Sequence, residues 1–159
     1  KMFKDKTIVY TSGTFDMFHF NHLRMINYSR GLGDILIVGV STDELVMSYK
    51  DKPVIPFDER LQIIEALKAP DIVIPQHTLD HTELVQKLNI DAFVVGDDWW
   101  GKYDFLKDLG VDVFYFPYGV GVSSTNIKKS IHDTYETKLK SQQDTKPTFV
   151  NKSKLSVNE

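Results

Sequence analysis

The sequence contains no cysteine, which excludes disulfide bonds, thiolate metal sites and a cysteine nucleophile. No apolar run approaches the roughly 18 residues that a membrane-spanning helix needs, so we expect no membrane span. Basic residues are not in excess: 19 Lys and Arg stand against 22 Asp and Glu, giving a net charge of −3. This balance argues against a nucleic-acid partner, which calls for a basic surface. Residues 1–6 are charged and lack an apolar signal core, so we expect a cytoplasmic protein.

What the chain does have is enough apolar material for one sizeable core. Of its 159 residues, 42% are hydrophobic and 12% aromatic, and the length predicts one domain. Residues 136–159 differ from the rest, with five lysines, three acidic residues and many Ser, Thr, Gln and Asn. Such a segment buries too little apolar surface to offset its ordering entropy. We therefore predict a domain over residues 1–135 and a polar, flexible C-terminal tail over residues 136–159.

Short β-branched or aromatic runs alternate with segments of helical periodicity. The predicted strands are residues 7–11, 35–40, 72–74, 92–95 and 111–116. The predicted helices are the region from Leu23 to Arg30 and residues 43–49, 57–68, 82–88 and 125–131. Strands that alternate with helices indicate βαβ units. The fold class is therefore α/β: a Rossmann-like, doubly wound, five-stranded parallel sheet with helices on both faces. Ligands of such sheets bind beyond the carboxyl ends of the strands.

Two histidines three residues apart follow the first predicted strand. His19 and His22 lie where a loop gives way to a helix, and Asn21 is the expected N-cap. Free backbone N–H groups and the helix dipole at this point attract phosphate, to which two imidazoles would add donors. The alternatives are a histidine pair that only packs or caps, and a zinc site, which lacks an evident third ligand.

A glycine- and hydroxyl-rich stretch follows the last predicted strand. Residues 119–126 read Gly-Val-Gly-Val-Ser-Ser-Thr-Asn and precede an apolar-periodic helix. This is a second anion-binding pattern, unless it is an ordinary capped helix after a turn. No G-x-x-x-x-G-K motif is present, and no G-x-G-x-x-G follows the first strand, so a nucleotide is not held by either of these motifs.

These motifs together resemble those of the cytidylyltransferases of the nucleotidyltransferase superfamily. Gly-Thr-Phe-Asp at residues 13–16 with His19 and His22 resembles the signature G-T-[FY]-D-x-x-H-x-G-H. Gly-Val-Ser-Ser-Thr at residues 121–125 resembles the second signature, R-T-x-G-[IV]-S-[ST]-T, and residues 56–60 resemble the central E-R element. Residues 96–107, which read GDDWWGKYDFLK, are similar to a stretch of the glycerol-3-phosphate branch. The resemblance covers residues 7–131.

The resemblance implies transfer of CMP from CTP to glycerol 3-phosphate, with release of pyrophosphate. The catalytic residues it implies are His19, His22, Lys50, Lys52 and Arg60. The nucleotide-binding residues it implies are Gly13, Thr14, Phe15, Gly96, Asp97, Asp98, Trp99, Val122, Ser123, Ser124 and Thr125. For the acceptor it implies Lys52, Trp99 and Trp100. Surface roles are the alternative for Lys50, Lys52 and Arg60, and loop packing is the alternative for the two tryptophans.

The resemblance also implies Mg²⁺ bound mainly through the nucleotide phosphates, with no metal site made of protein side chains alone. It implies a homodimer and a role in making precursors of a cell-surface polymer. Asp16 is expected to orient a histidine or its own loop. His77 and His81 are expected on the surface.

The sequence departs from the family pattern at two positions. Asn21 stands between the histidines where the family has glycine, so its side chain either crowds the nucleoside or adds a hydrogen bond. Tyr118 stands where the second signature begins with arginine, and Lys128 and Lys129 are candidates to replace that charge. The alternative functions are transfer to ribitol, ethanolamine or choline phosphate, adenylyl transfer to a sugar or flavin phosphate, and nucleotide binding with weak turnover.

Overall fold

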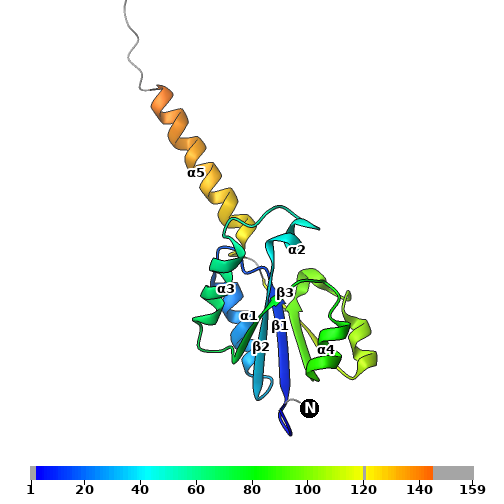
Figure 1. The fold of residues 1–159 in the computed structure, drawn as a ribbon. Coiled ribbons are helices and arrows are strands. Elements are labelled where there is room, and N and C mark those ends of the chain that lie inside the picture. Colours follow the sequence, from blue (N-terminus) through cyan, green and yellow to red (C-terminus); the bar gives the residue numbers. More distant parts are fainter. Residues whose placement is uncertain (1–2, 120, 145–159) are drawn as a thin grey trace, which may run out of the picture. The chain divides into compact units, whose positions relative to one another are not determined.

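The computed structural model describes residues 3–119 and 121–144. The chain alternates strands and helices along its length, as Figure 1 shows. The elements in order are β1 (Ile8–Gly13), α1 (Phe20–Arg30), β2 (Ile35–Ser41), α2 (Asp43–Met47), α3 (Phe57–Glu65), β3 (Ile72–Gln76), α4 (Thr82–Leu88), β4 (Ala92–Gly96), the 3₁₀ helices η1 (Asp97–Trp99) and η2 (Asp104–Leu109), β5 (Asp112–Phe116) and α5 (Ser124–Asp144).

The five strands form one parallel sheet in the order β3-β2-β1-β4-β5. The chain moves outward from β1 to one edge and then returns to build the other side, so the order reverses beside β1. Strands β1, β2 and β4 are buried over almost their whole length, as their continuous apolar sequences predict. The α/β class and the five-stranded parallel sheet predicted from the sequence are therefore confirmed.

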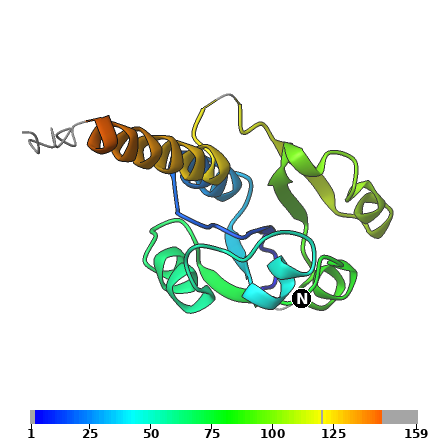
Figure 2. The ribbon, with the colours of Figure 1, turned by 90° about the horizontal axis from the view of Figure 1, so that it is seen from above.

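Two apolar layers lie on opposite faces of the sheet, because successive side chains of a strand point to opposite sides. On one face Val9 and Val38 pack against Met25 of α1 and Ile64 of α3. On the other face Ile8, Tyr10 and Phe93 pack against Val85 of α4 and Leu106 of η2. Figure 2 shows α1 (blue) and α3 (teal) on one side of the strands and α4 (green) on the other. The predicted helices on both faces are present.

The C-terminal helix is longer than the sequence analysis predicts. Helix α5 begins at Ser124 and continues to Asp144, so the prediction that this helix ends near residue 131 is wrong. The compact sheet domain ends at Ser124, and a second unit begins at Thr125, whereas we expected the boundary after residue 135. Residues 136–144 of the predicted tail are helical, and residues 145–159 lie outside the described residues.

Candidate active site

The loop after β1 has an unusual backbone. Phe15 and Met17 adopt φ angles of 54° and 48°, in the left-handed region that non-glycine residues rarely occupy. Phe15 is nevertheless buried, and its ring lies so close to Gly13 that a Cβ there would meet ring atoms at 3.2 Å. Strain of this kind persists only where the surroundings enforce it, and it is concentrated at functional sites. Gly13, Thr14 and Phe15 therefore form a shaped loop rather than a mobile one.

His19 and His22 form a stacked pair at the start of α1. Their ring centroids are 3.7 Å apart with an angle of 20° between the planes. Helix α1 begins at Phe20, with His19 rather than the predicted Asn21 at the N-cap. His22 Nδ1 accepts a hydrogen bond from the His19 backbone N–H at 3.3 Å. A neutral imidazole carries one proton, so that bond leaves the His22 proton on Nε2, where it can be donated to a ligand.

Both histidines are held in the neutral form. Burial lowers the pKa of His22 to about 3, helped by the neighbouring His19 and by the positive charge of Lys50, while Asp16 acts in the opposite direction. Burial also lowers the pKa of His19. A polyphosphate bound beside them would favour the protonated forms, because an opposite charge raises the pKa of a base.

Asp16 joins the β1 loop to two other segments. Its carboxylate accepts hydrogen bonds from the backbone N–H groups of Val54 and Ile55, both at 2.9 Å. Its carbonyl oxygen accepts a hydrogen bond from Ser124 Oγ at 2.5 Å. These bonds tie the loop of Asp16 to residues 54–55 and to Ser124, whereas the expected role of Asp16 in orienting a histidine or its loop stays a prediction. Because Asp16 precedes His19 by three residues, the bond from Ser124 joins the second signature to the loop that leads to the histidines.

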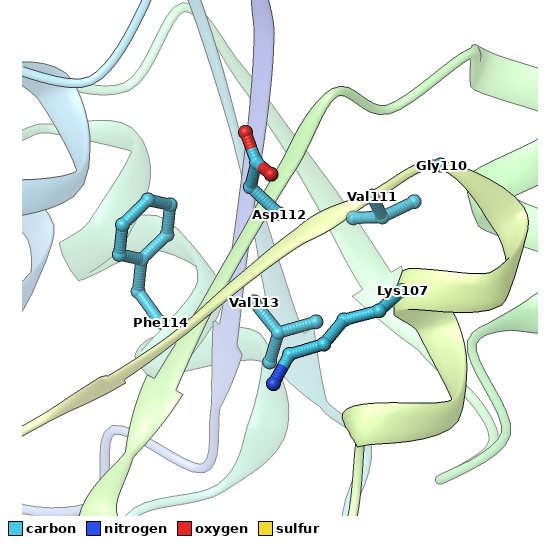
Figure 3. A pocket seen from close by; sticks show the side chains of 6 residues that line it. All are labelled: Lys107, Gly110, Val111, Asp112, Val113 and Phe114. Atoms are coloured by element: carbon cyan, nitrogen blue, oxygen red, sulfur yellow. The ribbon is translucent and has the colours of Figure 1, made fainter.

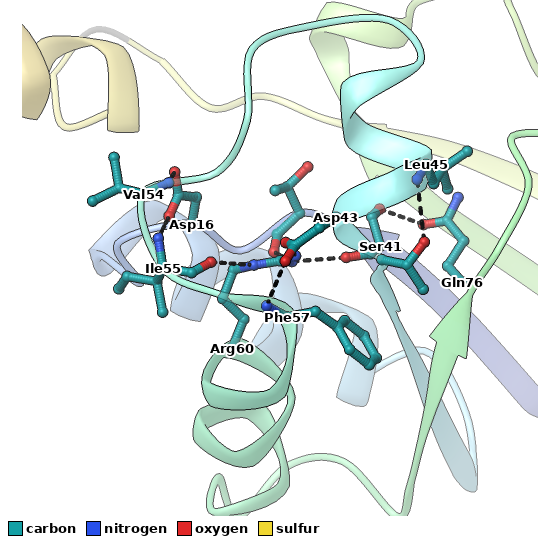
Figure 4. Close-up of polar contacts among 11 residues, drawn as sticks. Asp16, Ser41, Asp43, Leu45, Val54, Ile55, Phe57, Arg60 and Gln76 are labelled. Atoms are coloured by element: carbon teal, nitrogen blue, oxygen red, sulfur yellow. Dashed lines mark hydrogen bonds and ion pairs between the residues drawn. The ribbon is translucent and has the colours of Figure 1, made fainter.

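Arg60 is the interior support of this region rather than a surface cation. Its side chain is fully buried, and its guanidinium donates to the carbonyl oxygens of Thr14, Ser41 and Ile55 at 2.5, 2.8 and 2.9 Å, as Figure 4 shows for Ser41 and Ile55. A fourth bond, at 2.8 Å, pairs it with the Asp43 carboxylate. The prediction of Arg60 as a catalytic residue is corrected: these bonds to the protein direct its donors inward, and it positions the loop through Thr14.

Asp43 is a supporting residue of this region that the sequence analysis missed. Burial alone raises the pKa of Asp43, but hydrogen bonds from Arg60 and from the Phe57 N–H, with the charges of Arg60 and Lys52, lower it overall. The carboxylate is therefore ionised at neutral pH and balances the buried guanidinium. Its position in the sequence could have indicated it, because Asp43 comes two residues after the end of β2. Residues that follow the strands of a parallel sheet lie at the edge where ligands bind.

Lys50 and Lys52 follow α2 in a loop that reaches the same edge of the sheet. Both are exposed. Lys50 Nζ lies 5.4 Å from the centre of the Tyr49 ring, and its charge contributes to the pKa values of both His22 and Asp98. Lys52 contributes to the pKa of Asp43. Lys50 thus acts electrostatically on groups from two other strand ends, and its phosphate-neutralising role stays a prediction.

The end of β4 is closely packed by Tyr118. A Cβ on Gly96 would lie 2.1 Å from a ring carbon of Tyr118, so only glycine fits beneath this ring. The Tyr118 hydroxyl donates to the Met25 sulfur at 3.3 Å, and burial raises the pKa of the phenol. Tyr118 therefore fills an interior space and does not take over the charge of the family arginine. Asp97 is exposed beside Tyr118. Partial burial of the Asp98 carboxyl raises its pKa.

The two tryptophans have different surroundings. The Trp99 ring packs against Tyr49 and Tyr103, with centroids 5.8 Å away in each case, and Lys102 Nζ lies 5.0 Å from it. Trp100 is 75% exposed and contacts Tyr115 at 5.0 Å. The Trp99 ring therefore packs between the segment after α2 and the segment after η1. The Trp100 ring is mostly exposed to solvent. Their contacts with an acceptor stay predictions.

His77 and His81 lie in contrasting places. His77 is exposed, as expected. The surface position expected for His81 is wrong, since His81 is 2% exposed and packs among Tyr10, Phe93 and Tyr103, with centroids 4.8–5.4 Å away. A histidine next to a helix start appeared polar in sequence, but aromatic neighbours from β1, β4 and the segment after η1 enclose it.

Within the sheet domain, the ends of β1, β2, β4 and β5 bring together most of the predicted site. The residues at this edge are Gly13, Thr14, Phe15, His19, His22, Lys50, Gly96, Asp98, Val122 and Ser124. Thr125 belongs to the second unit, and its role stays a prediction. An open hollow is lined by Lys107 and residues 110–114, where β5 begins, and includes none of these edge residues (Figure 3).

Two features are absent from residues 3–119 and 121–144. No group of three or more His, Cys, Asp or Glu side chains is placed to hold a metal ion there. In the same ranges, none of the helices combines the length and hydropathy needed to pass through a bilayer.

Comparison with known proteins agrees with this geometry. Residues 10–130 match the family model described as cytidylyltransferase-like. The chain is 42% identical over 124 residues to the glycerol-3-phosphate cytidylyltransferase of Bacillus spizizenii, covering 77% of this chain and 95% of that enzyme. It is 37% identical to the enzyme of the same name from Staphylococcus aureus, covering 78% and 94%.

A solved structure shows the same likeness in three dimensions. The lipopolysaccharide core biosynthesis protein of Thermoplasma volcanium superposes with a TM-score of 0.61 at 27% identity, covering 70% of this chain and 95% of that one. With a family model that spans most of the chain and relatives matched over nearly their whole length, this protein belongs to the cytidylyltransferase-like family.

Proposed function

We propose that this protein transfers CMP from CTP to glycerol 3-phosphate, giving CDP-glycerol and pyrophosphate. The observation that carries the proposal is the stacked His19–His22 pair at the start of α1, beside the charge of Lys50 and within a loop bonded to Ser124. The acceptor is chosen from the relatives, because enzymes named for glycerol 3-phosphate match this chain at 37–42% identity over 94–95% of their length.

The reaction is a direct displacement at phosphorus. An oxygen of the glycerol phosphate attacks the α-phosphorus of CTP, and the bond from that phosphorus to the bridging oxygen of the β-phosphate breaks. The electron pair leaves with pyrophosphate, and no covalent enzyme intermediate forms. The attacking phosphate is already an anion, so no general base is needed. Catalysis depends on bringing two anions together and stabilising the charge of the transition state.

The residues divide this work by their chemistry. His22, with Nδ1 occupied by the His19 N–H, presents Nε2–H as a donor to phosphate oxygens. Lys50 and Lys52 neutralise the reacting phosphates. Ser123 and Ser124, at the end of the sheet domain, supply hydroxyl donors for the terminal phosphates. Asp98 accepts from the cytosine amino group or a ribose hydroxyl, and Trp99 borders the acceptor.

Mg²⁺ is proposed as the counter-ion of the triphosphate, held mainly by phosphate oxygens and water. This fits the acidic residues of the region, because Asp16 and Asp43 already accept hydrogen bonds from the protein. When bound, the ion supplies positive charge to the leaving pyrophosphate. We further propose that the protein acts in the cytoplasm as a homodimer, which sedimentation would measure.

The decisive experiment is a grid of nucleotides against acceptors with Mg²⁺ present. Pyrophosphate release from CTP with glycerol 3-phosphate, and a CDP-glycerol signal by phosphorus NMR, are expected. Robust release from ATP with a sugar or flavin phosphate, and none from CTP with glycerol 3-phosphate, would reject the proposal. CTP binding without turnover against any acceptor would instead identify a nucleotide-binding protein.

A further inference from the structure

Asn21 connects the start of α1 to the loop that follows β5. Its side-chain Nδ2 donates to the carbonyl oxygen of Val122 at 2.6 Å, joining residues 101 positions apart in sequence. Asn21 is buried, at 6% exposure, whereas Val122 is 46% exposed. A buried side chain of α1 therefore bonds the backbone of a residue that is itself half-exposed. The contact lies directly beside His22.

Arg24 fixes the orientation of the Asn21 amide. Arg24 Nη1 donates to Asn21 Oδ1 at 3.1 Å, and the guanidinium carbon lies 5.3 Å from the centre of the Phe116 ring. An amide has its acceptor and its donors at different atoms, so the bond from Arg24 leaves the Nδ2 donor turned toward Val122. The aromatic ring at the end of β5 thus holds Arg24, and Arg24 orients Asn21.

Two further contacts fix the same segment on either side of Val122. The Tyr118 hydroxyl donates to the Met25 sulfur of α1, and Ser124 Oγ donates to the Asp16 carbonyl oxygen. Asn21 supplies the contact between these two. Both departures from the family pattern, Asn21 and Tyr118, therefore act on the same pair of segments, α1 and residues 118–124.

We propose that Asn21 is a positioning residue for nucleotide binding, which holds residues 122–124 beside His22 in the absence of the family arginine. The inference rests on the proposed function, because the loop is placed for the phosphates of CTP. It answers the alternative left open by the sequence: the Asn21 side chain adds a hydrogen bond within the protein and orders the loop.

The first test measures the loop without any nucleotide. In Asn21→Gly, hydrogen exchange of the amides of residues 122–124 should become about tenfold faster, the ratio that a loss of about 1.4 kcal/mol gives. Asn21→Asp should match it, since a carboxylate still accepts from Arg24 but cannot donate to Val122. Asn27→Gly, at an exposed position of the same helix, controls for the lower helix propensity of glycine. Unchanged exchange in Asn21→Gly or Asn21→Asp would overturn the proposal.

The second test separates positioning from general stability through kinetics. Asn21→Gly should raise KM for CTP about tenfold, while kcat at saturating CTP and KM for glycerol 3-phosphate stay within about twofold of wild type. Asn27→Gly should leave all three unchanged. An unchanged or lower KM for CTP in Asn21→Gly would overturn the proposal, because the side chain would then be neutral or would crowd the nucleoside. If the wild-type protein shows no turnover, the proposed function fails, and the exchange experiment still decides whether Asn21 holds the loop.

Discussion

Arg60 donates a hydrogen bond to the carbonyl oxygen of Thr14 at 2.5 Å, so the third helix supports the loop that leads to the histidines. The same guanidinium bonds the end of β2 through Ser41 and the loop before α3 through Ile55. One buried cation therefore fixes the relative positions of three segments at the ligand edge of the sheet. The geometry of the candidate site therefore depends on a residue whose guanidinium donates to acceptors within the protein.

Replacing Arg60 should destabilise the protein strongly. Arg60→Met removes the partner of Asp43 and leaves one buried and two partly buried carbonyl oxygens without their donor, which we expect to cost about 3–5 kcal/mol in the free energy of unfolding. Urea unfolding measures this loss. Arg30→Met is the matched control, because the Arg30–Asp71 pair is about 40% exposed on both sides and should be worth less than about 1 kcal/mol. Equal effects of the two changes would contradict the role assigned to Arg60.

Replacing His22 should abolish turnover without unfolding the domain. His22→Ala removes the Nε2–H donor that we propose for the phosphates, and the loss of one such donor typically lowers the rate about 100- to 1,000-fold. Pyrophosphate release and circular dichroism measure the rate and the fold. His77→Ala, at an exposed position, should retain the wild-type rate. A His22→Ala protein with more than about a tenth of the wild-type kcat would show that His22 makes no contact specific to the transition state.

The alternation of apolar runs and amphipathic segments was sufficient to predict the sheet and its helices. The predicted strands at residues 35–40 and 92–95 lie within the observed β2 and β4. A strand that is covered on both faces of the sheet has apolar residues at successive positions. Such a run can be recognised from the sequence of the strand alone. The length of α5 was not predictable in the same way. Its polar C-terminal half lacks an apolar stripe wide enough to distinguish a helix from a tail.

The site could be located from sequence, but its internal supports could not. His19, His22 and Ser124 were found because each follows a strand and belongs to a recognisable motif. The buried roles of Arg60 and His81 depend on which distant residues enclose them, such as Asp43 for Arg60 and Phe93 for His81. Charge and polarity predict exposure on average, and only the packed structure shows the exceptions.

Binding of CTP should change the protonation of the histidine pair. In the free protein the pKa of His22 is about 3, well below the value near 6.5 of an unperturbed histidine, so its ring should stay neutral from pH 8 to 5. The negative triphosphate favours the protonated form, so CTP should move the titration to higher pH. Proton NMR of the imidazole resonances measures both states. A His22 that titrates near 6.5 without nucleotide would contradict its assigned environment.

His81 should make the free energy of unfolding depend on pH. Burial lowers the pKa of His81 in the folded state to about 4, with the Asp80 charge acting in the opposite direction, while the unfolded chain has a pKa near 6.5. The unfolded state therefore binds more protons between these values, and stability falls as the pH is lowered from about 6.5 toward 4. The contribution lost from this one residue is at most about 3.4 kcal/mol, because the two pKa values differ by about 2.5 and each pH unit corresponds to 1.36 kcal/mol.

The change His81→Phe isolates that contribution, because it keeps an aromatic ring among Tyr10, Phe93 and Tyr103 but cannot be protonated. Urea unfolding at a series of pH values should give a shallower decline between pH 6.5 and 4 for His81→Phe than for wild type, whatever the offset at pH 7. Other titrating groups are common to both proteins and cancel in the difference. His77→Phe, changed at an exposed histidine, should keep the wild-type slope. Parallel curves for wild type and His81→Phe would show that His81 is protonated as readily in the folded chain as in the unfolded one.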